Sequence, residues 1–243
     1  MALLEIRNLT KRFGGLIANQ SIDLSIEKNE VVGLIGPNGA GKTTFFNCIS
    51  GVYKPEGGTI TFDGEDITSY RADAICRCGI VRTFQIVRTY KGMTVLENAM
   101  IGAFCHTKDP RGARKEAQEA LAFTGLLDKK EALGRALTLP EKKRLAITIA
   151  LATKPKLLLL DEAMAGLTPK ESQASVDLIR RIHQSGITIL MVEHVMEVIM
   201  PISHRVIVLN YGVKIADDIP ERIVKDEKVI KAYLGDKYHA LSS

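Results

Sequence analysis

The sequence predicts an α/β protein whose sheet carries a phosphate-binding loop, and three observations predict it. The pattern Gly-x-x-x-x-Gly-Lys-Thr occupies residues 36–43, directly after an apolar run at 31–35 and before a helix-like segment at 43–50. Four consecutive leucines at 157–160 are typical of a strand buried on both faces of a parallel sheet. A further buried-strand pattern at 187–192 follows an amphipathic helical segment at 169–184, so strands and helices alternate as in α/β folds.

The composition excludes several classes of protein. The chain has 243 residues, of which 46% are hydrophobic and 25% charged, which is ordinary for a globular protein. Its net charge of +5 comes from 33 basic and 28 acidic residues that are interleaved, so we expect no nucleic-acid partner. The four cysteines lack metal-ligand spacing and are expected to be reduced structural thiols. Neither a signal peptide nor a run of about 18 apolar residues is visible, so the chain is not expected to cross a membrane by itself.

The phosphate-binding loop, residues 36–43, turns sharply from a strand into a helix. Such a turn leaves several backbone N–H groups facing one concavity, and its glycines let the backbone approach an anion closely. The helix N-terminus adds partial positive charge. Lys42 is expected to reach the β- and γ-phosphates of a nucleotide, and the Thr43 hydroxyl to bind Mg²⁺. A glycine-rich turn with an incidental lysine is the alternative, and the flanking strand and helix disfavour it.

The N-terminal part predicts a small antiparallel sheet beside the nucleotide site. Alternating apolar residues at 3–9 and 21–26 indicate two strands, and residues 59–62 indicate a further short one. Phe13 stands in the connection between the first two strands. An exposed aromatic ring there could stack on an adenine or could cover an edge of the core. The residues alone favour neither interpretation over the other.

The middle of the chain changes from strands to helices. Residues 80–84 are predicted to form a strand that ends at Gln85, whose amide could lie near a bound metal or water, although most such glutamines are surface groups. From residue 93 the apolar period becomes helical, with helix-start patterns at Thr94 and Asp109. Helices are predicted over 98–102, 110–124 and 126–136. We therefore expect a helical subdomain, residues 86–136, inserted within a single domain that spans 1–243.

Two acidic residues, Asp161 and Glu162, directly follow the run of leucines. They are expected at the carboxyl end of a strand, where open α/β sheets bind ligands. Asp161 would hold Mg²⁺, often through water, and Glu162 would polarise the water that attacks a γ-phosphate. The alternative, an acidic helix N-terminus, is less favoured in a chain with a phosphate-binding loop. His194 follows the strand 187–192, where a neutral imidazole could donate to a γ-phosphate oxygen.

The C-terminal part predicts a hairpin and a final helix. The hairpin strands are expected at 206–209 and 213–216, and the helix at 226–234. The four other histidines lack the placement of His194 and are expected to be surface or core residues.

With these motifs in this order, the chain resembles the nucleotide-binding subunit of ABC transporters over essentially its whole length. Segments 81–85, 93–98 and 232–235 are similar to branched-chain amino-acid importers, in particular to their first ATPase subunit. The resemblance implies a P-loop NTPase fold: a RecA-like mixed sheet core with an antiparallel β subdomain and a helical subdomain. It also implies an ATP hydrolase that powers uptake of branched-chain or related amino acids. Urea or amide importers, lipopolysaccharide-type exporters and non-transport ABC ATPases share part of the pattern and stay open as alternatives.

The resemblance implies roles for individual residues, with ATP and Mg²⁺ as cofactors. Phe13 matches the adenine-stacking aromatic, Gln85 the metal- and water-sensing glutamine, and Asp161 the Mg²⁺ aspartate. Glu162 matches the catalytic glutamate and His194 the switch histidine. The phosphate-binding loop matches at Gly36, Pro37, Asn38, Gly39, Ala40, Gly41, Lys42, Thr43 and Thr44.

Three departures from the family pattern concern contacts across a dimer. The signature Leu-Ser-Gly-Gly-Gln appears as Leu-Thr-Leu-Pro-Glu at 137–141, and Pro140 removes one N–H donor to a γ-phosphate held by the opposing subunit. Thr138 and the glutamate three residues later form a capping-box pattern, so the helix should still present its positive end and a hydroxyl. Ala163 replaces the proline that usually follows the catalytic glutamate, and residues 165–168 lack the usual aspartate.

The resemblance further implies partners and a location. ATPases of this family work as head-to-tail dimers, so we expect a second ATPase subunit, in this importer type usually a different chain. Transmembrane permease subunits and, indirectly, a solute-binding protein are also expected, at the cytoplasmic face of the membrane. A repair or translation factor would be expected to have tandem cassettes or long insertions, which are not visible. The acidic pair, Lys42 and His194 argue against a catalytically silent module.

Overall fold

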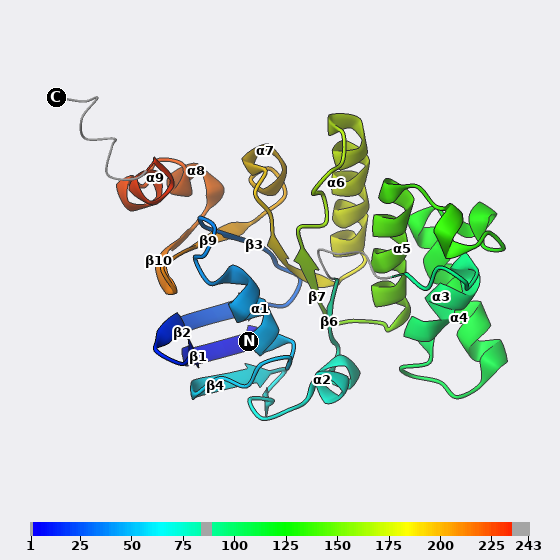
Figure 1. The fold of residues 1–243 in the computed structure, drawn as a ribbon, viewed down its shortest axis with the longest axis horizontal. Coiled ribbons are helices and arrows are strands. Elements are labelled where there is room, and N and C mark those ends of the chain that lie inside the picture. The colour runs from blue at the N-terminus through cyan, green and yellow to red at the C-terminus, as the bar shows by residue number, and fades with distance from the viewer. Residues whose placement is uncertain (1, 84–88, 235–243) are drawn as a thin grey trace. The chain divides into compact units, whose positions relative to one another are not determined.

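The computed structural model describes residues 2–83 and 89–234 of the chain. They form two compact units: the first unit comprises residues up to 72 and those from 188 onward, and the second unit residues 73–187. Strands and helices occur in both units, as Figure 1 shows. Within the described ranges, neither unit contains a helix that is long and apolar enough to cross a membrane.

The first unit contains the predicted antiparallel sheet. Its strand order is β2-β1-β4-β5, and all neighbours run antiparallel. The strands are β1 (Ala2–Phe13), β2 (Leu16–Glu27), β4 (Gly57–Phe62) and β5 (Glu65–Asp66). The first two strands are longer than predicted, because the turn between them is only Gly14 and Gly15. Phe13 is therefore the last residue of β1 rather than a residue of a connecting loop, which corrects the sequence-based expectation.

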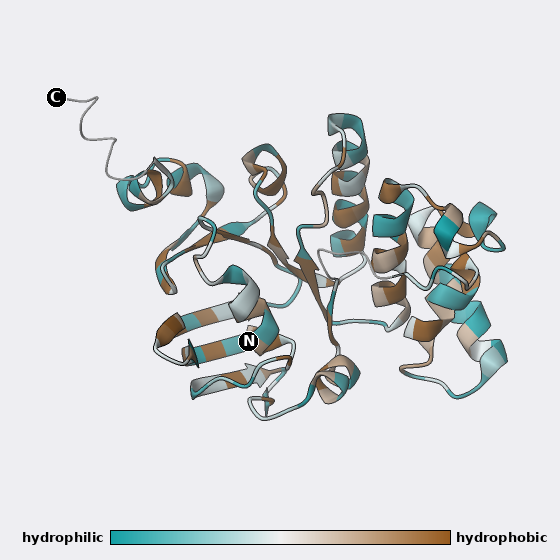
Figure 2. Ribbon diagram, in the orientation of Figure 1, coloured by the Kyte–Doolittle hydropathy of each residue, from teal (hydrophilic) through white to brown (hydrophobic). Residues whose placement is uncertain are grey.

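Four further strands of the first unit follow the order β10-β9-β3-β8. They are β3 (Val31–Ile35), β8 (Thr188–Val192), β9 (Arg205–Asn210) and β10 (Val213–Asp218). β3 runs parallel to both of its neighbours, and β10 pairs antiparallel with β9 in the predicted hairpin. Every residue of β3 and β8 is buried, and Figure 2 shows these strands as largely hydrophobic. The predicted buried strands are confirmed, since only a strand covered on both faces can be apolar throughout.

The helices of the first unit follow the strands that they cover. They are α1 (Lys42–Ile49), α7 (Met196–Ile199), α8 (Pro220–Ile223) and α9 (Glu227–Leu234). The predicted bounds of α1 and α9 agree with the observed ones to within one residue at either end. The other two, each a single turn of four residues, were not predicted, because one turn is too short to display an apolar period.

The second unit combines two parallel strands with helices. β6 (Ile80–Arg82) pairs with β7 (Leu157–Asp161), which is buried throughout as predicted. The helices are α2 (Ala72–Cys78), α3 (Val95–Ala103), α4 (Pro110–Thr124), α5 (Leu139–Ala152) and α6 (Pro169–Gln184). Thr94 caps α3 in the predicted capping box with Glu97, and Asp109 caps α4. The helix predicted over 126–136 is wrong: this segment forms two short 3₁₀ turns, Leu127–Lys129 and Gly134–Ala136.

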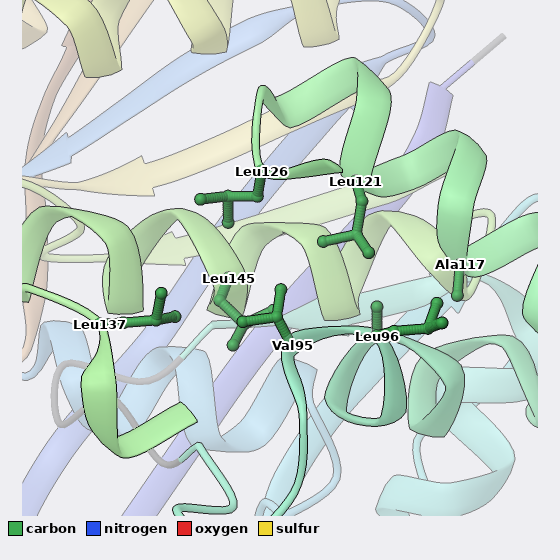
Figure 3. Close-up of a cluster of buried hydrophobic side chains, with 8 residues drawn as sticks. Val95, Leu96, Ala117, Leu121, Leu126, Leu137 and Leu145 are labelled. Atoms are coloured by element: carbon green, nitrogen blue, oxygen red, sulfur yellow. The ribbon is translucent and has the colours of Figure 1, made fainter. Parts of the chain in front are cut away.

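Helices α3, α4 and α5 share one apolar core. Its buried side chains are Val95, Leu96, Ala99, Ala117, Leu121, Leu126, Leu137 and Leu145. The side chains that Figure 3 labels point toward one another. Leu126 and Leu137 belong to this core although they lie outside the helices. The segment between them follows its contacts with the core rather than a helical period, which explains why the predicted helix does not form there.

Gly102 lets α3 approach α5 closely. A Cβ atom at this position would lie 2.1 Å from the carbonyl oxygen of Ile149, which is far inside contact distance. We expect Gly102→Ala to push the two helices apart and to lower the free energy of unfolding by about 2 kcal/mol, as overpacking does. Urea denaturation measures the loss. Gly92→Ala is the matched control, because a Cβ there meets nothing within 4 Å. Equal stability of the two variants would contradict the close approach.

Candidate functional site

The phosphate-binding loop begins where β3 ends and finishes at the first turn of α1. Gly39 and Gly41 have φ values of 80° and 99°, a region that L-residues with a Cβ rarely adopt. The N–H of Ala40 donates to the carbonyl of Pro37 at 3.1 Å, and that of Phe45 to Gly41 at 2.9 Å. The loop thus curls over the N-terminus of α1, as the motif predicts, and presents backbone donors where the helix has its partial positive charge.

Two distant segments of the first unit hold this loop from outside. The fully buried Asn19 of β2 donates from Nδ2 to the carbonyl of Gly41 at 3.2 Å. The N–H of Gly212, in the turn between β9 and β10, donates to the carbonyl of Ala40 at 3.0 Å. A Cβ on Gly36 would lie 2.1 Å from the carbonyl oxygen of Leu209. The sequence did not reveal these supports, because they join residues far apart in the chain.

Lys42 lies within the concavity of the loop. Its Nζ donates to the carbonyl oxygens of Gly36, at 2.6 Å, and Pro37, at 2.9 Å, and only 7% of the residue is exposed. The neighbouring Thr43 is exposed at the start of α1. The ammonium group is therefore already placed among the loop's backbone groups, and a hydroxyl oxygen is available beside it.

Phe13 packs against one neighbouring aromatic ring and leaves part of its own ring exposed. Its ring meets that of Tyr53 edge-to-face, with centroids 5.2 Å apart, while 43% of Phe13 is exposed. The Nζ of Lys11 lies 5.2 Å from the Phe13 centroid and forms an ion pair with Glu56. These contacts fix the orientation of the ring in the first unit, and its exposed part can accept a flat partner.

His194 lies just beyond the end of β8. Because Leu34 of β3 pairs with Val192 of β8 in parallel register, the two strands end at the same level. Gly36, the first residue of the phosphate-binding loop, comes two residues after Leu34, and His194 comes two residues after Val192. His194 is exposed, whereas the preceding Glu193 is buried. The sequence-based placement of the histidine at the loop's end of the sheet is thus confirmed within the first unit.

The acidic pair of the second unit occupies the end of β7. Asp161 is the last residue of the strand, and its carboxylate forms an ion pair with Arg82 at 2.6 Å, with the two side chains about 5% exposed. Its N–H donates to the Thr83 hydroxyl at 3.4 Å. Glu162 has a φ of 49°, and its carbonyl accepts a hydrogen bond from Nζ of Lys143 at 3.1 Å. The backbone at Glu162 is therefore in a strained conformation that its surroundings impose.

The two residues expected to bind Mg²⁺ each carry an oxygen that suits this ion. Asp161 offers a carboxylate and Thr43 a hydroxyl, the hard oxygen ligands that this ion prefers. Among the described residues, no group of three or more His, Cys, Asp or Glu side chains could hold a metal ion.

The altered signature forms the start of α5. Thr138 is the N-cap, and its N–H donates to the Glu141 carboxylate at 2.9 Å in the predicted capping box. Pro140 stands in the first turn, where a missing N–H costs the helix nothing. The ion pair with Lys129, followed by the hydrogen bond from Thr138, lowers the pKa of the Glu141 carboxyl. Glu141 is thus engaged in holding the helix start.

One predicted site residue, Gln85, lies outside the described residues.

One important residue was not predicted at all: Arg82, the partner of Asp161. An arginine at the end of an otherwise apolar strand pattern, 80–82, is the signal that could have identified it, since a buried cation requires an acidic partner.

Comparison with protein families gives two matches. Residues 19–165, more than half of the chain, match the family described as ABC transporter. Residues 213–239 match a second family, described as branched-chain amino acid ATP-binding cassette transporter.

Several curated proteins are similar over nearly their whole length. The high-affinity branched-chain amino acid transport ATP-binding protein BraF of Pseudomonas aeruginosa is 41% identical, with 96% of this chain and 98% of BraF covered. LivG of Escherichia coli, described in the same words, is 40% identical over the same shares. The lipopolysaccharide export system ATP-binding protein LptB of Haemophilus influenzae is 32% identical, with 98% of this chain and 99% of LptB covered.

Solved structures agree with the fold. A nucleotide-free ATP-binding cassette from an ABC transporter superimposes with a TM-score of 0.89 at 30% identity, covering 97% of this chain and 100% of that one. The ADP conformation of an ATP-binding cassette of an ABC transporter gives 0.88 at 30% identity, with the same coverage. The predicted α/β class with a P-loop NTPase core is confirmed.

The contribution of the buried ion pair between Arg82 and Asp161 to stability can be tested by mutation. Arg82→Leu would leave the Asp161 carboxylate buried without its cation, so we expect the free energy of unfolding to fall by about 3 kcal/mol. Urea denaturation measures the change. Arg77→Leu is the control, because the ion pair of Arg77 with Asp73 is more than half exposed and its loss should destabilise the chain far less. A loss at Arg82 no larger than that at Arg77 would show that Asp161 does not depend on this partner.

Proposed function

The chain belongs to the ABC transporter family, and from this membership we propose that it is the ATP-hydrolysing subunit of an importer for branched-chain or related amino acids. The match of residues 213–239 to the branched-chain amino acid cassette family carries the proposal, because the general cassette match does not distinguish substrates. The relatives at 40–41% identity, whose names give branched-chain amino acid transport, support it.

In this proposal the phosphate-binding loop holds the β- and γ-phosphates of ATP. Backbone N–H groups and the α1 N-terminus supply donors that are in place before the nucleotide arrives. Lys42 exchanges its two carbonyl partners, Gly36 and Pro37, for phosphate oxygens in the same concavity. Phe13 stacks its exposed part on the adenine. Because hydrogen bonds from Asn19 and Gly212 hold the carbonyl groups of the loop, ATP binding requires little rearrangement of its backbone.

The remaining site residues act on the γ-phosphate. Thr43 and Asp161 hold Mg²⁺, which when bound neutralises charge on the β- and γ-phosphates. Glu162 accepts a proton from the attacking water, and its fixed backbone orients the carboxylate. His194 donates a hydrogen bond to a γ-phosphate oxygen and so distinguishes ATP from ADP. Gln85, which matches the metal- and water-sensing glutamine of the family, would contact the metal ion and the attacking water.

The chain works in this proposal with a second ATPase subunit and with transmembrane permease subunits at the cytoplasmic face of the membrane. Each phosphate-binding loop faces the partner's signature. Thr138 and the start of α5 would therefore serve the nucleotide of the partner, where Pro140 offers one donor fewer. The site built on this chain's own loop is the fully competent one.

The substrate is tested in the assembled complex. We expect a solute-binding protein loaded with leucine, isoleucine or valine to raise ATP hydrolysis several-fold above the basal rate in proteoliposomes. Urea and lipopolysaccharide are the comparison substrates, since LptB, which is named for lipopolysaccharide export, is 32% identical. Stimulation by either of these, and not by amino acids, would contradict the assignment.

The asymmetry between the two sites is tested by Glu162→Gln on this chain alone. Since the site on this chain's loop carries most of the turnover, we expect the complex to lose most of its hydrolysis rate, because the loss of a general base slows its own site by at least about 10²-fold. Glu197→Gln, at an exposed position close to His194, is the control and should keep the wild-type rate. Unchanged turnover in Glu162→Gln, with complete loss when the partner's equivalent glutamate is changed, would refute the proposal.

A further inference from the structure

Two cysteines of the second unit lie in contact with each other. Cys76 belongs to α2, and Cys105 directly follows the C-cap of α3. Their Sγ atoms are 3.6 Å apart, so one thiol donates a hydrogen bond to the other. Both are free thiols and both are half-buried, so a small solute can reach them. The fold thus brings together two thiols that are 29 residues apart in the chain.

The other two cysteines have different surroundings. Cys78 also belongs to α2, but residues two apart on a helix point to different faces, so α2 directs Cys78 away from the side on which Cys76 meets Cys105. Cys48 is fully buried in α1 of the first unit. Chemistry that needs two adjacent and accessible thiols is therefore expected at Cys76 and Cys105.

The two thiols differ in their readiness to react. Burial, followed by the contact with Cys105, raises the pKa of the Cys76 thiol to about 12. Cys76 therefore stays protonated at neutral pH, and the first attack on an oxidant falls to Cys105. The guanidinium group of Arg77 interacts electrostatically with both sulfurs, and a nearby cation favours attack by a thiolate. The pair thus consists of an attacking thiol and a resolving thiol.

We propose that Cys76 and Cys105 form a site of reversible oxidation, at which hydrogen peroxide converts the two thiols into a disulfide bond. The Cys105 sulfur attacks one peroxide oxygen, the O–O bond breaks, and the leaving hydroxide takes up the thiol proton as water. The Cys76 sulfur then attacks the sulfur of the resulting sulfenic acid. The S–O bond breaks, and the second hydroxide leaves as water with the Cys76 proton. Two thiols lose two electrons, and one peroxide becomes two waters.

The disulfide joins α2 to the end of α3 and closes a loop of the chain that contains β6. β6 carries Arg82, whose guanidinium group pairs with the buried Asp161 carboxylate at 2.6 Å. α3 in turn packs closely on α5 at Gly102. Oxidation therefore links the strand that supports Asp161 to the helical core of the second unit, and it makes local opening of that strand less favourable. This inference goes beyond the proposed function and does not depend on it.

The test treats the full, reduced chain with hydrogen peroxide, blocks the remaining thiols and analyses tryptic peptides by mass spectrometry. Trypsin cuts after Arg77, between Cys76 and Cys78, so the mass of a cross-linked peptide identifies its cysteine. We expect one disulfide within the chain, which joins peptide 72–77 to peptide 92–108 and disappears with dithiothreitol. The melting temperature should rise by at least about 5 °C on oxidation, and amide exchange in β6 should slow.

Three serine variants separate the possible outcomes. Cys78→Ser is the matched control on the same helix and should keep the bond and the rise in melting temperature. Cys76→Ser should lose both and accumulate sulfenic acid at Cys105, which dimedone traps, whereas Cys105→Ser should leave the Cys76 thiol unoxidised. Melting of each variant under reducing conditions shows whether it is folded. Peroxide that leaves the wild-type thiols unlinked, or that links either of them to Cys78 or to a second chain, would overturn the proposal.

Discussion

The backbone of the phosphate-binding loop is held by contacts from segments far apart in the chain, and the arrangement of the first unit depends on these contacts. Asn19 and Gly212 bind its carbonyl groups, and Gly36 is wedged against Leu209. The glycines at 36 and 41 are thus required by steric space as much as by their φ values, because a Cβ at either would lie within 2.3 Å of a carbonyl oxygen. A loop held in this way can bind an anion without first becoming ordered, which lowers the entropic cost of binding.

Features that depend on neighbouring residues were predictable from the sequence. The strand 31–35 and the helix 169–184 begin and end where the pattern places them. Both are marked by local signals: an apolar run followed by glycine in the strand, and a Thr168 cap followed by Pro169 in the helix. The motif residues Lys42 and Asp161 were found from local signals too: Lys42 belongs to the glycine-rich pattern that follows the strand 31–35, and Asp161 directly follows the run of leucines.

Features that depend on distant contacts were not predictable. The segment 126–136 has enough apolar residues for a helix, but its leucines are used by a core formed with α3, α4 and α5. Phe13 was placed in a loop, because nothing in its own neighbourhood shows that β1 extends so far along β2. Arg82 looked like one more polar residue at a strand end until its pairing with Asp161, 79 residues later, gave it a role.

The position of Pro140 at the start of α5 determines in which subunit a mutation there would have its effect. Pro140 satisfies the helix as well as any residue could, because no hydrogen bond is required of it there. A change at this position therefore leaves the chain's own fold and its own phosphate-binding loop intact. In the proposed dimer, its effect would be felt by the nucleotide on the other subunit. A mutation at position 140 of this chain would then change ATP hydrolysis at the site on the partner subunit, which another gene encodes. A substitution that restores this hydrolysis would be expected in the partner's phosphate-binding loop rather than in this chain.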